Sequence, residues 1–302
     1  MLEIFVDVVL PVFLMAGAGA LLARLRHVPA HSISQLTLYV FAPALVFGSL
    51  ANTTLSLEQL GKITLFTLVL AAVMYLLSLV TAKLLRLDRE QTSGFLLTTI
   101  FMNSGNYGLP VALFAFGEAG LELAVVFFVT QAALGGTLAV FIASRSQLDV
   151  KGALLSVLRM PLLHATLLGL AVNLLDVQLP TTIGEPVRIL GNAAVPSMLM
   201  VLGIQLATRF SMEDTRALVA ATFMKLVVAA GVAYLITPLL GIDGVPRQVL
   251  VVVSAMPTAV FTIILSTEFQ ARPSFVTSTV VLSTLLSLVT LTVLVTVVDA
   301  LL

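Results

Sequence analysis

The chain has 302 residues, of which 59% are hydrophobic and only 10% are charged, and its formal net charge is zero. A soluble domain carries about 25% charged residues, so this chain lacks the charge to cover a water-facing surface. The absence of cysteine excludes disulfides, thiolate metal sites and cysteine nucleophiles, and no basic tract indicates nucleic acid as a partner. We therefore expect an integral membrane protein.

Apolar runs that approach or reach the roughly 20 residues needed to span hydrocarbon recur along the chain. Loop-like breaks between them predict an all-α membrane protein with ten transmembrane helices. The predicted segments are 2–23, 32–51, 61–85, 91–117, 121–144, 153–175, 184–208, 214–238, 246–269 and 274–299. The first is expected to be a retained helix rather than a signal peptide, because Glu3 and Asp7 precede or open its apolar run and Arg24 and Arg26 follow it.

Lysine and arginine are unevenly divided between the two sets of loops. The loops after odd-numbered segments contain Arg24, Arg26, Lys83, Arg86, Arg89, Arg145, Lys151, Arg159, Arg209, Arg216 and Arg272. The opposite loops contain only Lys62, Arg188 and Arg247. Because cytoplasmic loops carry the excess of positive charge, we expect the odd loops in the cytoplasm and both termini outside the inner (cell) membrane.

Prolines recur at similar positions in the two halves of the chain. The matched pairs, at offsets of 150, 153 and 147 residues, are Pro11 with Pro161, Pro43 with Pro196, and Pro110 with Pro257. Each half holds five predicted helices, an odd number, so the second copy enters the membrane from the opposite side. This pattern predicts two inverted five-helix repeats, 1–148 and 149–302. The alternative is that prolines are simply common in transmembrane helices.

Two segments contain sequences that a regular helix cannot accommodate. In the fourth, Met102–Pro110 reads Met-Asn-Ser-Gly-Asn-Tyr-Gly-Leu-Pro, and in the ninth, Ser254–Thr258 reads Ser-Ala-Met-Pro-Thr. Glycine permits non-helical angles and proline removes a backbone donor, so both helices are expected to break in mid-membrane. The freed backbone groups then have to face protein, water or a ligand.

These breaks are the candidate binding site. The N-termini of half-helices present N–H groups and a partial positive charge, which suit a carboxylate or another small anion. We expect substrate contacts from Asn103, Ser104, Asn106, Tyr107, Pro110, Met256, Pro257 and Thr258. The alternative is that Asn103 and Asn106 cap the half-helices and bind nothing.

Other polar residues lie within the predicted helices. Lys225, in the middle of the eighth, is expected to face a partner or a wet cavity because a charge is costly there. It either holds a substrate carboxylate or exchanges partners during transport, or else it forms a structural ion pair or extends towards the interface. Gln131 and Gln205 are expected to form interhelical hydrogen bonds. His164 is expected to be structural, with proton coupling as the alternative.

Hydroxyl groups share faces of the last two helices. Thr258, Thr262 and Ser266 recur at helical spacing in the ninth, as do Ser283 and Ser287 in the tenth. They either edge a polar path or pack as ordinary small residues. Three carboxylates close to helix ends are expected to be solvated: Glu118, Glu122 and Glu268.

The sequence resembles the auxin efflux carrier family over essentially its whole length. The resemblance rests on Asn103–Pro110, on Ala255–Pro257 and on Val281–Ser287. It implies a bacterial member related to the plant PIN-FORMED carriers, with helices 4 and 9 crossing at their prolines. It also implies a scaffold of helices 1, 2, 6 and 7 and a transport domain of helices 3–5 and 8–10 that moves as an elevator. The long cytoplasmic loop of many plant members is missing, since only Ser144–Lys151 stands there.

These features predict a secondary active transporter of a small organic anion, with the lipid bilayer around it and a homodimer as an open option. The resemblance implies a carboxylate such as malate, malonate or an auxin-like acid. No cofactor, metal or catalytic residue is expected, because no zinc helix, nucleophile elbow or pair of intramembrane aspartates is present. The main alternative is a sodium-coupled organic-anion symporter of the bile-acid type, although neither break contains Asp or Glu. Two matched broken helices favour alternating access over a channel or receptor.

Overall fold

The computed structural model of the chain describes residues 1–26, 30–144, 155, 157–207 and 214–301. Within these ranges every named element is a helix, and the one extended pairing is an isolated antiparallel bridge between Met102 and Thr258. The expectation of an all-α protein is confirmed. Three basic residues of the charge argument, Arg145, Lys151 and Arg209, lie outside the described residues, as does the predicted repeat boundary at 148–149.

The helices include short π-type stretches with wide turns, labelled η. The first half contains α1 (Leu2–Ile4), η1 (Phe5–Val9), α2 (Leu10–Arg26), α3 (Ala30–Leu36), η2 (Thr37–Phe41), α4 (Ala42–Ala51), α5 (Leu57–Leu84), α6 (Arg89–Ile100), η3 (Ser104–Gly108), α7 (Leu109–Leu134), η4 (Gly135–Ala139) and α8 (Val140–Ala143). The second half contains α10 (Pro161–Leu174), α11 (Thr181–Asn192), α12 (Ala194–Leu206), α13 (Thr215–Phe223), η5 (Met224–Val228), α14 (Ala229–Leu239), α15 (Gly244–Ser254), α16 (Phe261–Glu268) and α17 (Pro273–Leu301).

Seven of the described helical runs are long and apolar enough to cross a membrane. They are Leu2–Arg26, His31–Ala51, Leu57–Leu84, Ser104–Ala143, Thr181–Leu206, Thr215–Leu239 and Pro273–Ala300. The helices α10 and α15 are apolar but shorter. The predicted sixth and ninth crossings fall on these shorter helices, and the fourth is divided between α6 and the run that begins at Ser104. A multi-pass membrane protein is therefore confirmed, while the count of ten helices stays a prediction.

The run Ser104–Ala143 is interrupted inside α7. At Gly117 φ is +66° and ψ is −160°, which is not a helical conformation. Glycine adopts this combination readily, whereas a β-carbon would make it strained. The interruption falls at the predicted end of the fourth segment, so that α7 joins parts of two predicted helices.

Small residues allow α2 and α12 to cross in close contact. A β-carbon on Gly19 would lie 2.2 Å from the carbonyl oxygen of Met200, and one on Gly203 would lie 1.7 Å from that of Ala16. Without a hydrophobic driving force between helices in lipid, such backbone approach is a principal source of helix association. The glycines are therefore required by the packing.

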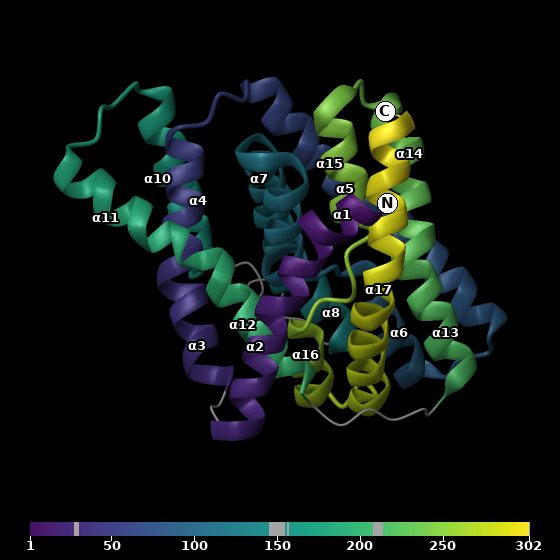
Figure 1. Cartoon of the computed structure of the whole chain (residues 1–302). Helices are drawn as coiled ribbons and strands as arrows, with labels where there is room; N and C mark the ends of the chain where they lie inside the picture. Colours follow the sequence, from purple (N-terminus) through teal and green to yellow (C-terminus); the bar gives the residue numbers. More distant parts are fainter. Residues whose placement is uncertain (27–29, 145–154, 156, 208–213, 302) are drawn as a thin grey trace.

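A second close crossing joins α4 to α10. A β-carbon on Gly169 would lie 2.9 Å from the carbonyl oxygen of Phe47. Figure 1 shows α4, α10 and α11 on one side of the molecule and α13, α14 and α17 on the other, with α2 and α12 between them. The two glycine-dependent crossings thus join helices 1 and 7 and helices 2 and 6 of the prediction.

Two interrupted helices meet in the interior. The helix α6 ends at Ile100 and the chain becomes extended at Phe101, while α15 ends at Ser254 and α16 begins at Phe261. The backbone N–H of Asn103 donates to the carbonyl of Pro257 (2.8 Å), and that of Ala259 donates to the carbonyl of Phe101 (3.0 Å). These reciprocal bonds flank the Met102–Thr258 bridge, so each break pairs backbone groups freed by the other.

The expectation that the chains cross at Pro110 and Pro257 is correct for Pro257 only. The carbonyl of Pro257 takes part in the crossing, whereas Pro110 lies near the start of α7, eight residues beyond Met102. Proline fits the first turn of a helix, where its missing N–H is tolerated. The chain therefore leaves α6 at the asparagine- and glycine-containing stretch, and Pro110 belongs to the helix that follows.

The close crossing of α2 and α12 predicts an effect of enlarging Gly203. Gly203→Ala places a β-carbon against the backbone of Ala16, so the helices must separate, and we expect a loss of about 1–3 kcal/mol. Gly17→Ala is the matched control, because a β-carbon there would meet nothing within 4 Å. The melting temperatures of the two variants are measured by thermal unfolding in detergent. Circular dichroism follows the unfolding, because the chain has no tryptophan or cysteine to serve as a probe. Equal melting temperatures for the two variants would contradict the packing.

The crossing also predicts that Thr258 contributes to stability through its hydroxyl. Its Oγ1 donates to the carbonyl of Thr98 at 2.7 Å in a fully buried position. Thr258→Val keeps the shape but leaves that carbonyl unpaired, which we expect to cost about 1–3 kcal/mol. Thr258→Ser keeps the hydroxyl and should be the more stable of the two variants in the same unfolding measurement. The opposite order would show that the methyl group, not the hydrogen bond, matters.

Candidate functional site

The crossing brings the carbonyl end of half-helix α6 against side chains of the second break and of η5. The carbonyl of Thr98 accepts from Thr258, and that of Thr99 lies 3.5 Å from Nζ of Lys225 in η5. The backbone N–H of Thr258 donates to Oγ of Ser283 in α17 at 3.2 Å. A helix ending in hydrocarbon would leave these groups without partners, so the crossing is a built polar centre within an apolar core.

Asn103 lies at the N-cap position of η3, between the two half-helices. Its backbone is fully used, since its N–H donates to Pro257 and its carbonyl accepts from Gly108 at 2.9 Å. Its side chain makes no capping hydrogen bond, and its Nδ2 is buried without a partner in the described part of the chain. An unpaired buried donor costs about 1–3 kcal/mol. The alternative that Asn103 serves as a capping residue is therefore wrong, and its amide is free to bind an acceptor.

The remaining predicted residues of the first break have different surroundings. Ser104 is buried, and Asn106 is partly exposed. Tyr107 is fully buried, with its hydroxyl 2.8 Å from Oγ of Ser287. Its ring also stands edge-on to Phe13 of α2, with centroids 6.1 Å apart. Tyr107 therefore holds η3 against α17 and α2 and has no polar atom left to offer as a donor.

The residues of the second break are buried or have protein partners for their polar groups. Met256 is fully buried, and its Cγ lies 3.4 Å from the place of a β-carbon on Gly108. The carbonyl of Pro257 and both the hydroxyl and the N–H of Thr258 have protein partners. The structure thus gathers the predicted residues of the second break and Asn103 of the first around one crossing, while Pro110 lies farther along in α7. The side-chain donor without a partner among the described residues is on the Asn103 side of the crossing.

Lys225 is completely buried, and it faces the crossing. Its Nζ donates to the Thr99 carbonyl, and among the described residues no carboxylate lies within ion-pair distance of it. The alternative of a side chain extending to the interface is therefore wrong, and no structural ion pair of Lys225 is present among the described residues. Its partner, which the sequence does not identify, is the carbonyl end of a half-helix.

The expectations for the two buried glutamines and for Glu122 differ from the structure, whereas that for His164 agrees with it. The Nε2 of Gln131 and the Oε1 of Gln205 are buried without partners in the described residues, so these atoms do not make the expected interhelical hydrogen bonds. His164 is exposed, with Nδ1 3.0 Å from the carbonyl of Met160, which fits a structural role. Glu122 accepts from the hydroxyl of Thr53 and from the N–H of Thr54 and so ties the α4–α5 connection to α7.

Ser283 and Ser287 of α17, which the sequence places on one face of the helix, both bond to residues of the breaks. Ser283 and Ser287 accept from, or pair with, Thr258 and Tyr107, one group from each break. Their separation of four residues places both on one side of the helix. The prediction left open a polar path or ordinary packing, and the observed bonds make them supports of the crossing.

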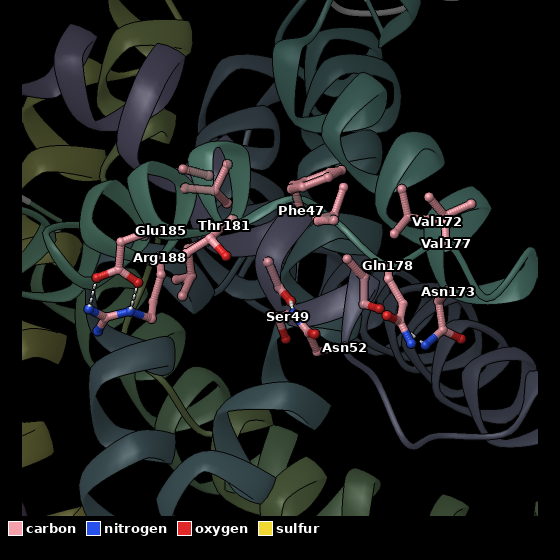
Figure 2. Close-up of a pocket in the computed structure, with 18 of the residues that line it drawn as sticks. Phe47, Ser49, Asn52, Val172, Asn173, Val177, Gln178, Thr181, Glu185 and Arg188 are labelled. Carbon is pink, nitrogen blue, oxygen red and sulfur yellow. Dashed lines mark hydrogen bonds and ion pairs between the residues drawn. The ribbon is translucent and has the colours of Figure 1, made fainter.

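A separate cavity of about 630 Å³ opens between α4, α10 and α11 (Figure 2). None of the predicted substrate-binding residues lines it. Its charged lining residues are Glu118, Asp176, Glu185 and Arg188, and the guanidinium of Arg188 already pairs with Glu185, with Nε 2.9 Å from Oε2. Three carboxylates against one paired guanidinium do not favour an anion. The crossing therefore remains the candidate site.

Comparison with known proteins finds a membrane transport family and several transporters among the relatives of the chain. Residues 4–295 match the family described as membrane transport protein. An uncharacterized transporter of Methanocaldococcus jannaschii is 25% identical over 93% of this chain and 95% of its own. An uncharacterized transporter of Methanothermobacter thermautotrophicus is 28% identical over 87% of each chain. A Rhizobium meliloti protein named "Putative malonate transporter" is 26% identical over 94% of this chain and 92% of its own.

These relatives are transporters rather than enzymes, in agreement with the expectation drawn from the absence of catalytic motifs. The match to the family extends over nearly the whole chain, including both breaks and the helices that support them. The chain belongs to the membrane transport protein family, that of the auxin efflux carriers which its Asn103–Pro110 motif resembles.

Proposed function

We propose that this protein is a secondary active transporter of a small organic anion, and that the anion binds at the crossing of the two broken helices. The observation that carries the proposal is the unpartnered, buried amide of Asn103 at the start of η3. A carboxylate oxygen there would satisfy the amide and lie at the positive end of the half-helix formed by η3 and α7. The proposed substrates are carboxylates such as malonate, malate or an auxin-like acid.

The charges around the crossing support an anion rather than a cation. Neither break contains Asp or Glu, and the basic side chain of Lys225 donates to the Thr99 carbonyl at the end of α6. The name of the Rhizobium meliloti relative points to a dicarboxylate. The proposed contacts are the amides of Asn103 and Asn106 and the hydroxyl of Ser104, with Tyr107, Pro110, Met256, Pro257 and Thr258 forming the walls.

The proposed architecture is ten transmembrane helices in two inverted repeats, 1–148 and 149–302. The glycine crossings support it independently of the prolines. Gly19 and Gly169 are 150 residues apart, and the carbonyls that they approach, those of Phe47 and Met200, are 153 apart. These are the offsets of the first two proline pairs. The reciprocal hydrogen bonds about Met102 and Thr258 have the local two-fold symmetry that inverted repeats require.

An elevator movement is the proposed mechanism. The glycine crossings join helix 1 to helix 7 and helix 2 to helix 6 within the proposed scaffold. Ser283, Ser287 and Lys225 tie the crossing to helices 8 and 10 in the proposed transport domain. The edge-on contact of Tyr107 with Phe13 lies between the two groups. In this proposal both termini lie outside the cell membrane, and the scaffold is available for a homodimer.

The proposal predicts opposite effects of Asn103→Ala on transport and on stability. We expect malonate uptake into proteoliposomes at low concentration to fall by about tenfold or more, as for loss of a hydrogen bond to a charged ligand. The melting temperature without substrate should stay the same or rise, because the variant removes an unpaired buried donor. A purely structural asparagine would instead lower the melting temperature.

Asn192→Ala is the matched control, since Asn192 is an exposed asparagine that lines the cavity between α4, α10 and α11. Its uptake should equal that of the unchanged protein. Loss of uptake in Asn192→Ala with normal uptake in Asn103→Ala would move the site to that cavity. A screen with malate and an aromatic carboxylic acid in the same liposomes identifies the substrate class.

The second candidate function is the sodium-coupled symporter, which the carbonyl groups gathered at the end of α6 favour, because oxygen ligands bind such cations. Uptake with and without an inward sodium gradient, at fixed membrane potential and pH, separates the two. We expect a rate that is unchanged when choline replaces sodium, because no carboxylate stands in either break. Uptake that requires sodium would establish the symporter instead.

A further inference from the structure

The lysine in η5 lies where a membrane protein can least easily hold a charge. Lys225 is in the middle of the run Thr215–Leu239 and is fully buried, with no described carboxylate as an ion-pair partner. A charged side chain at mid-membrane is retained where it faces a polar partner and has a function. The partner here is the carbonyl of Thr99, at 3.5 Å.

The helices packed against η5 supply no other charge at that depth. They are α6, α13, α14 and α17. Their ionisable residues are Arg89 and Glu90 at the start of α6, Arg216 at the start of α13, Tyr234 in α14 and Asp299 at the end of α17. The Oγ1 of Thr222, one turn before Lys225 on the same face, is buried without a partner among the described residues. The surroundings of the ammonium are therefore neutral oxygens.

Those oxygens include the negative end of a helix dipole. The helix α6 stops at Ile100, so the carbonyls of its last turn have no donors within the helix. The Thr98 and Phe101 carbonyls receive the Thr258 hydroxyl and the Ala259 N–H, and the Thr99 carbonyl receives Lys225. In transporters with broken helices, the carbonyl ends of half-helices are the places that coordinate coupling cations.

We propose that the ammonium of Lys225 is a resident cation. It occupies, at the carbonyl end of α6, the position that a metal ion takes in a cation-coupled carrier, and it makes a bound metal ion unnecessary. Lys225 occupies this position in the protein without bound substrate. The consequence for transport, that the fixed charge accompanies the crossing and balances one negative charge of the anion, rests on the proposed function.

The test is replacement of the side chain and addition of small cations. Lys225→Ala leaves the carbonyl end of α6 open, and we expect a melting temperature lower by about 5 °C or more in a choline buffer. Ammonium, methylammonium or sodium should restore at least half of that loss, whereas tetramethylammonium, which has no N–H donor and is too large, should not. The unchanged protein should melt at the same temperature in all these salts.

Lys83→Ala is the matched control, because Lys83 is an exposed lysine in the last turn of α5. It should show no dependence on the cation. A Lys225→Ala protein whose stability is the same in every salt would overturn the proposal. So would an unchanged protein that sodium itself stabilises, because its site would then still be open to a metal ion.

A second pair of variants covers the case in which Lys225→Ala does not fold. Lys225→Arg keeps a cation, and Lys225→Gln keeps an N–H donor without the charge. We expect uptake to be about tenfold higher for the arginine variant than for the glutamine variant. Equal uptake by both would show that a hydrogen bond alone suffices. Failure of the unchanged protein to transport any carboxylate would refute the proposed function but leave the cation-dependent melting of Lys225→Ala as a separate result.

Discussion

The structure depends on one constraint, which is that hydrocarbon cannot solvate a backbone carbonyl or N–H group. A helix that stops in mid-membrane frees several of each, and every one left unpaired is costly. Here the two broken helices supply one another: Asn103 and Ala259 donate across the crossing to Pro257 and Phe101. Side chains complete the pairing where the backbone does not reach, through Thr258, Ser283 and Lys225. Among the described residues, the side-chain amide of Asn103 is a buried donor that this arrangement leaves without a partner.

The same constraint accounts for two kinds of contact between the helices. Where no polar pairing is needed, helices associate by backbone approach through glycine, as at Gly19, Gly169 and Gly203. Where pairing is needed, hydroxyl groups from α17 and the lysine of η5 hold the crossing instead. Close backbone packing therefore holds the helices in one part of the molecule, and side-chain hydrogen bonds hold them in the other. The two parts meet where the ring of Tyr107 stands edge-on to Phe13, a contact without hydrogen bonds between the two side chains.

The sequence was sufficient for features that a single stretch of residues determines. The all-helical membrane fold follows from the long apolar runs, and both breaks follow from their glycine and proline content. The place of Pro110 was not predictable in this way, because proline both ends helices and begins them, and only the pairing across the crossing decides between the two. The partner of Lys225 was also not predictable, because it is a backbone carbonyl, which every residue has. Asn103 could be selected as a binding or capping residue, but the choice required knowing that its side chain makes no cap.

The connection between α4 and α5 carries a mechanical consequence. Nδ2 of Asn173, from α10, donates to the carbonyls of Ala51 and Thr53, at 3.3 and 2.9 Å. From the other side, Glu122 of α7 accepts from the hydroxyl of Thr53 and the N–H of Thr54. Thr53 is thus held by α10 on one side and by α7 on the other. In the elevator movement that we propose, either one of these sets of hydrogen bonds breaks or the chain turns about Thr53, so this short connection would act as a pivot.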